Sequence, residues 1–179
     1  MKSSRLRVIH GLVFFFLIYI LCSFQTVVWY QVFGTLASPF FSFIVFVYFG
    51  LDKDDWKSVL YCYSIIFIYS FFSYSSLGIL MVTCVFNYIF LYIIKNRVYW
   101  PGAAYFTFIT GISMLMFHVI YLLNSYLFEP HFSPILFWDR LFQIATTTGL
   151  AFYAYPIIKR LDILFKPEIP TEVHGELNG

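Results

Sequence analysis

Charged residues are scarce in this 179-residue sequence, at 11%, whereas 61% of the residues are hydrophobic. A soluble domain carries about 25% charged residues, so this chain lacks the side chains to cover a surface that faces water. Its formal net charge is only +2, and its basic residues are scattered between apolar runs, which excludes a nucleic-acid-binding protein. The composition therefore predicts an integral membrane protein in contact with lipid.

Cysteine is also rare, with three residues in the whole chain. Cys22, Cys62 and Cys84 all lie inside apolar runs and none of them has CxxC spacing. This pattern excludes a disulfide framework and a cysteine metal site, and it predicts small, reduced, buried side chains.

Recognisable catalytic motifs are missing as well. The sequence has no HExxH, no GxSxG, no glycine-rich phosphate loop and no pair of carboxylates within two apolar segments. The acidic group Asp52, Asp54 and Asp55 in "LDKDDWK" is neutralised by Lys53 and Lys57, and we interpret it as a solvated turn. We therefore expect no enzyme activity, no cofactor and no metal. A lipid-modifying enzyme that uses an intramembrane histidine is the minor alternative.

Long apolar runs dominate what is present. A bilayer core of about 30 Å requires about 20 helical residues, and six segments approach this length. We predict spans over residues 8–29, 38–51, 57–73, 77–94, 101–127 and 135–157. The charged N-terminus "MKSSRLR" precedes an apolar run without a small-residue cleavage site, so we expect an uncleaved first span. The second span is short and begins at Pro39, which suits a tilted or partly buried helix.

The basic residues give an independent test of this division, because positively charged loops stay in the cytoplasm. With a cytoplasmic N-terminus, ten of the eleven basic residues fall inside and only Arg140 falls outside. The ten are Lys2, Arg5, Arg7, Lys53, Lys57, Lys95, Arg97, Lys159, Arg160 and Lys166. We expect an all-α, polytopic, six-helix transmembrane bundle over residues 1–165 with both termini cytoplasmic. The polar tail 166–179 is expected to be disordered.

His118, Asn87 and Gln25 are polar side chains that lie within the predicted spans. An ionisable group in a membrane span is a functional hypothesis by default. However, no intramembrane carboxylate accompanies His118, so we favour hydrogen bonds between helices for all three.

The last span, "FWDRLFQIATTTGLAFYAYPIIKRLD", combines charge, threonine and proline. On a helix, Asp139, Gln143, Thr146 and Thr147 fall within an arc of about 100°. Ala145 and Gly149 form an adjoining small-xxx-small face, which permits close helix approach. The pattern predicts a packing surface, directed either at this chain's own helices or at a partner protein.

Three stretches together resemble the rod shape-determining protein MreD family of bacteria. The first is "SPFFSFIVFVYFGL", similar to that family's proline-started second span. The second is "IYSFFSYSSLGILMVTCVFNYIFLYIIKNRVYW", a turn into a helix that begins at Leu77 and Gly78 and ends in Lys95 and Arg97. The third is the last span itself, with its late Pro156. This chain has Ser70 where many members of the family carry an aspartate before the turn.

The resemblance implies a non-enzymatic, multi-pass subunit of the cell-elongation machinery in the bacterial inner membrane. It implies binding to MreC and, through MreC, a link between MreB and the peptidoglycan synthase RodA with its penicillin-binding transpeptidase. Lipid would be the other partner. The interface residues predicted on this basis are Asp139, Arg140, Gln143, Thr147, Gly149, Phe128 and His131.

The family also resembles, in fold, the substrate-binding subunits of energy-coupling vitamin transporters. That likeness supplies the alternative function, a membrane subunit that captures a small molecule. It would need a polar pocket, for which the candidates are Asp139, Arg140, His118 and Asn87.

Overall fold

The computed structural model describes the chain except for residues 1, 53–55, 74, 98–101, 130–136 and 166–179. The described residues are almost entirely helical and contain no strand, which confirms the all-α prediction. In chain order the elements are α1 (Lys2–Ser23), the π-helical turn η1 (Phe24–Val28), α2 (Trp29–Phe33), α3 (Phe41–Asp52), α4 (Trp56–Ser70), α5 (Leu77–Arg97), α6 (Ala103–Phe128) and α7 (Phe137–Phe165).

Four helical stretches in the described part of the chain are long and apolar enough to cross a membrane: Gly11–Phe33, Leu77–Arg97, Ala103–Phe128 and Phe137–Ile163. They confirm a membrane protein with transmembrane helices. The other two predicted spans are also helices, but α3 has only 12 residues and α4 only 15. At a rise of 1.5 Å per residue they are about 18 and 22 Å long, less than a bilayer core of about 30 Å.

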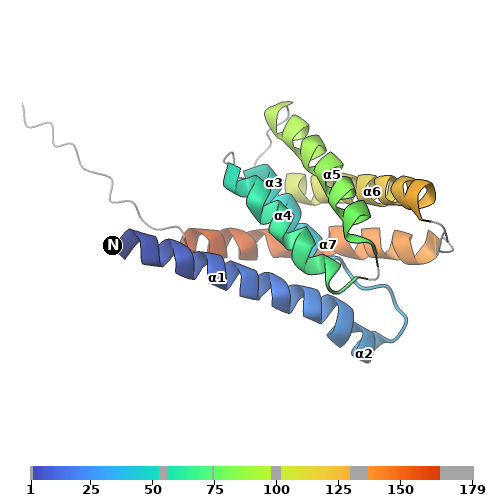
Figure 1. Ribbon diagram of the computed structural model, residues 1–179, viewed down its shortest axis with the longest axis horizontal. Coiled ribbons are helices and arrows are strands. Elements are labelled where there is room, and N and C mark those ends of the chain that lie inside the picture. Colours follow the sequence, from blue (N-terminus) through green and yellow to red (C-terminus); the bar gives the residue numbers. More distant parts are fainter. Residues whose placement is uncertain (1, 53–55, 74, 98–101, 130–136, 166–179) are drawn as a thin grey trace, which may run out of the picture.

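Helix α3 occupies the centre of the molecule and packs against α1, α4, α5, α6 and α7. Every residue from Ser42 to Gly50 is buried. A helix that is apolar on all sides is either buried in protein or lies in lipid, and this one is surrounded by protein. Its shortness follows from this position, because the chain reaches its start through a non-helical segment, residues 34–40, that returns into the bundle (Figure 1).

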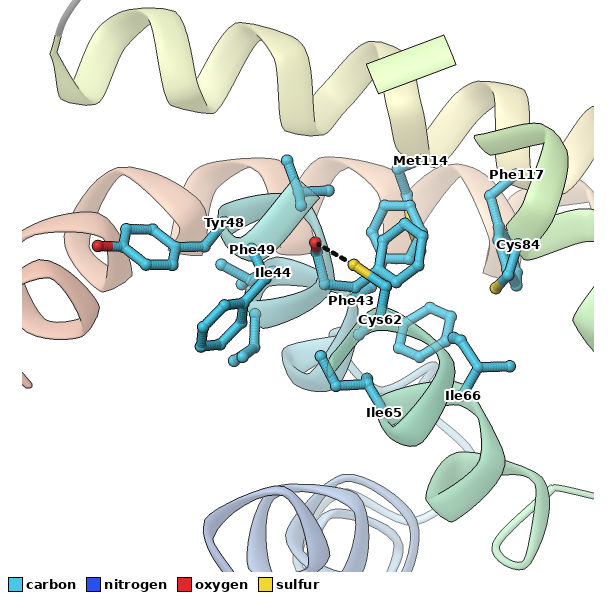
Figure 2. Close-up of a cluster of buried hydrophobic side chains, with 14 of the residues drawn as sticks. Phe43, Ile44, Tyr48, Phe49, Cys62, Ile65, Ile66, Cys84, Met114 and Phe117 are labelled. Carbon is cyan, nitrogen blue, oxygen red and sulfur yellow. Dashed lines mark hydrogen bonds between the residues drawn. The ribbon is translucent and has the colours of Figure 1, made fainter. Parts of the chain in front are cut away.

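Figure 2 shows part of the core, in which side chains of α4, α5 and α6 pack against those of α3. On α3 itself, Phe43 stacks on Phe46 with ring centroids 5.5 Å apart, and Phe117 of α6 meets Phe43 edge-on at 5.2 Å. Each such pair contributes about 0.5–1.5 kcal/mol beyond area burial. Cys62 and Cys84 lie in the same core as free thiols, and Cys22 is likewise buried and free, as the sequence predicted.

Helices α6 and α7 run antiparallel along one side of the bundle (Figure 1). They approach closely at Gly111, where an added Cβ would lie 3.2 Å from the side chain of Thr148. Helix α1 begins and α7 ends at the same end of the molecule (Figure 1). We call the opposite end, which holds α2, the end of α6 and the start of α7, the distal end.

The last helix is longer than the sequence predicted. It continues through Pro156 to Phe165, whereas the predicted span ended at residue 157. A proline removes one backbone hydrogen bond but does not stop a helix whose other turns remain bonded.

Candidate functional site

Polar side chains of α7 bind the chain segment that leads into α3. The side-chain amide of Gln143 donates from Nε2 to the carbonyl oxygen of Ser38 at 2.8 Å. The backbone N–H of Phe40 donates to Oγ1 of Thr147, also at 2.8 Å. The first N–H groups of a helix have no partner within the helix, and in a membrane an unsatisfied group costs several kcal/mol. Gln143 and Thr147 therefore stabilise a helix start that lies inside the protein.

This arrangement divides the predicted interface residues into two groups. Thr147 is fully buried and Gln143 is partly buried, and both bond within the chain. Asp139, Gly149 and Phe128 are exposed. His131 lies outside the described residues.

A second contact holds the start of α3 from the other side. The hydroxyl of Ser42 donates to Oε1 of Gln25 at 3.4 Å, and Gln25 is only 2% exposed. Gln25 belongs to the π-helical turn η1, in which backbone hydrogen bonds join residues five apart instead of the four of an α-helix. Such turns are often found where a side chain is redirected towards a neighbouring element.

Asn87 takes part in a separate polar contact between α5 and α6. Its Nδ2 donates to the carbonyl oxygen of Ser113 at 2.8 Å. Further along the same pair of helices, Nδ2 of Asn124 lies 3.5 Å from Oγ1 of Thr83. Such hydrogen bonds between helices hold membrane bundles together, and their double-mutant coupling energies average about 0.6 kcal/mol.

His118 and Arg140 meet near the distal end. Nη1 of Arg140 lies 3.0 Å from Nδ1 of His118, and the guanidinium carbon stands 5.4 Å from the centre of the Tyr121 ring. Beside them, the Tyr121 hydroxyl and the hydroxyl of Ser75 are 2.6 Å apart. A cation held between an imidazole and an aromatic face is stabilised by both contacts. We refer to His118, Arg140, Tyr121 and Ser75 as the distal polar cluster.

The structure thus brings together part of the pocket predicted from the sequence. His118 and Arg140 are in contact, whereas the hydrogen bond of Asn87 leads to Ser113 and Asp139 is exposed on the outer side of α7. Sequence reasoning missed two members of the distal polar cluster. Tyr121 follows His118 by three residues, a spacing that places both on one helix face and could have identified it. Ser75 comes from a turn far away in sequence, and no local signal points to it.

Among the described residues, no group of three or more His, Cys, Asp or Glu side chains is placed to hold a metal ion.

The outer face of α7 differs from its inner face. Ala145 and Gly149 are exposed there, and a Cβ added at Gly149 would meet nothing within 4 Å. Exposed aromatic side chains flank these small residues, with Phe152 at 48% and Tyr153 at 70% exposure. The arrangement leaves a shallow surface on which another helix could lie close.

Comparison with known proteins gives no relative for this chain: no family model, no curated protein and no solved structure matches it.

Proposed function

We propose that this protein is a non-enzymatic subunit of the bacterial cell-shape complex in the inner membrane. In this proposal it binds MreC and thereby links MreB to RodA and its penicillin-binding transpeptidase. The support from sequence is the resemblance carried by the proline-started segment at Pro39, the helix that starts at Leu77 and the last span with Pro156.

The observation that carries the proposal is the uncovered outer face of α7. This helix has only 11% of its span buried, against 39% for α6. Its polar side chains Gln143 and Thr147 are turned inwards and bonded, so the outer face offers small and aromatic residues. In lipid, helices associate where small residues let their backbones approach, so this face suits a membrane helix of a partner.

We further propose six crossings with both termini in the cytoplasm. Helices α3 and α4 are short, but α3 is extended by residues 34–40, in which the carbonyl of Ser38 and the N–H of Phe40 are bonded to α7. Non-helical backbone is tolerated at membrane depth when protein surrounds it. The common end of α1 and α7 and the basic residues assigned to that side support the orientation.

Affinity purification in mild detergent tests the proposed function. The tagged protein should recover MreC and the elongation synthase, and Gly149→Leu should weaken that recovery because the leucine side chain fills the shallow face. Gly11→Leu is the matched control, since a Cβ at Gly11 also meets nothing within 4 Å but lies on α1. Equal recovery of the partner by both variants would reject this face as the interface.

The alternative function is that of a substrate-binding subunit of an energy-coupling transporter. The contact between His118 and Arg140 favours it, because it places a cation and a buried imidazole at one end of the bundle. Purification would then recover paired ATPases with a coupling membrane protein instead of MreC. A member of a vitamin panel would also raise the unfolding temperature of the purified protein.

A further inference from the structure

The positive charge of Arg140 is directed into the protein. Arg140 is partly buried, and its guanidinium contacts His118 and the ring of Tyr121. His118 precedes the last residue of α6 by ten positions, which corresponds to about 15 Å along the helix. The guanidinium therefore contacts the side of α6 and not its C-terminal end.

The contact determines the hydrogen-bonding state of the histidine. A guanidinium can only donate hydrogen bonds, so Nδ1 of His118 must accept from Nη1 of Arg140. The imidazole is then neutral and carries its proton on Nε2. This atom is buried, and it has no hydrogen-bond partner within the described part of the chain. The histidine thus leaves one N–H donor unused, on the ring nitrogen that does not contact Arg140.

The neighbouring hydroxyls also have one donor hydrogen left over. Tyr121 and Ser75 share one hydrogen bond, in which one hydroxyl donates and the other accepts. The accepting hydroxyl keeps its own hydrogen for another acceptor. The distal polar cluster therefore combines a cation with several donors.

The contacts found for Arg140 supply no negative charge. Its partners in the described structure are an imidazole nitrogen and an aromatic ring. Asp139 is exposed, and adjacent residues on a helix point about 100° apart. Glu129, the acidic residue in the connection between α6 and α7, accepts a hydrogen bond from the hydroxyl of Ser125. Arg140 is also the one basic residue that the proposed topology assigns to the outer side.

We propose that the distal polar cluster binds an anionic phosphate or carboxylate group. A cation in a membrane span costs about 2.5–3.5 kcal/mol at mid-bilayer, and such residues mark functional sites by default. A planar guanidinium binds phosphate or carboxylate through two parallel hydrogen bonds, and the cluster holds that guanidinium in place from two sides. The anion can come from a lipid headgroup or from a soluble molecule. The inference is independent of whether the chain serves as a scaffold subunit or a transporter subunit.

The test uses the full-length protein in nanodiscs of phosphatidylcholine, with or without phosphatidylglycerol, and titrates inorganic phosphate as the soluble probe. The expected result is a higher unfolding temperature with one of these anions. Arg140→Lys should weaken the apparent affinity about tenfold or more, because a lysine cannot form the paired hydrogen bonds. Arg160→Lys, at the exposed other end of α7, is the matched control and should bind as the unaltered protein does.

The comparison of the two lipid compositions and the titration with phosphate together identify the source of the anion. Stabilisation by phosphatidylglycerol alone indicates a lipid headgroup, whereas stabilisation by phosphate in neutral lipid indicates a soluble ligand. Tyr121→Leu is a second variant that retains the charge of Arg140 but removes the supporting ring and hydroxyl, and it should also weaken binding. The proposal is overturned if neither anion shifts the unfolding temperature, or if Arg140→Lys binds as tightly as Arg160→Lys.

Discussion

Helices α3 and α7 show how differently two helices of one membrane protein can use their residues. Helix α3 is short, apolar on every side and buried, whereas α7 is more than twice as long and exposes most of its length. In a soluble protein the more polar helix would face water. Here Gln143 and Thr147 of α7 face inwards and bond the chain at the start of α3, whereas its aromatic side chains Phe152 and Tyr153 are exposed. Hydrophobicity alone therefore does not reveal which helix forms the centre.

The largest difference between the two helices should appear when an aromatic ring is removed. Phe43→Ala should lower the free energy of unfolding by about 3 kcal/mol, because the fully buried ring packs against Phe46 and Phe117 and its loss leaves a cavity. Phe152→Ala on the outer face of α7 should change it by less than about 0.5 kcal/mol. Reversible unfolding in mixed micelles measures both. Similar losses for the two variants would show that α3 is not the centre of packing.

The hydrogen bonds from α7 to the start of α3 should come next. Thr147→Val should cost about 1–3 kcal/mol, since it leaves the buried N–H of Phe40 without an acceptor. Thr146→Val is the matched control, because the hydroxyl of Thr146 only bonds carbonyls of its own helix, and it should cost less than about 0.5 kcal/mol. If both substitutions have the same effect in the micelle assay, the proposed role of Thr147 is wrong.

The glycines of the two helices provide a third comparison. A Cβ at Gly50 would lie 2.8 Å from Cδ1 of Leu91, whereas one at Gly149 would meet nothing within 4 Å. Gly50→Leu should therefore destabilise the protein by about 1–3 kcal/mol through overpacking. Gly149→Leu should leave the stability of the isolated protein within about 0.5 kcal/mol. Destabilisation by the Gly149 substitution would mean that this face packs within the chain.

The smallest effect is expected at the second contact of the α3 start. Ser42→Ala removes a hydrogen bond to Gln25 that is long, at 3.4 Å. The expected loss is about 0.6 kcal/mol, the average for such polar pairs in a membrane bundle. Thermal unfolding of the purified variant, compared with Thr147→Val, would show whether α7 or η1 makes the stronger contact. A larger loss for Ser42→Ala would reverse that order.

Much of the helical layout followed from the sequence. The runs of apolar residues placed all six helical segments, and the positions of Pro39, Leu77 and Pro156 suggested their starts and interruptions. The central place of α3 had only two hints, its short length and its starting proline. Its hydrogen bond with α7 joins residues 107 positions apart, and sequence patterns do not report such distances.

The candidate site was predicted less completely, for a physical reason. Helical spacing predicted one polar face with Asp139, Gln143, Thr146 and Thr147, of which only Gln143 and Thr147 bond the segment before α3. Small and polar residues serve contacts within a chain and contacts with a partner equally well. The sequence therefore gave no basis for separating the inward Thr147 from the outward Gly149. The contact between Arg140 and His118 depends on how α6 and α7 align, and this alignment is visible only in the structure.

The most direct test of the account compares the two faces of α7 in one experiment. Tagged Thr147→Val and Gly149→Leu proteins would be purified in mild detergent, and both their stability and their co-purifying membrane partner would be measured. The account predicts that Thr147→Val loses stability, whereas Gly149→Leu keeps its stability and loses the partner. Retention of the partner by a stable Gly149→Leu protein would contradict the claim that the outer face of α7 is where this protein binds.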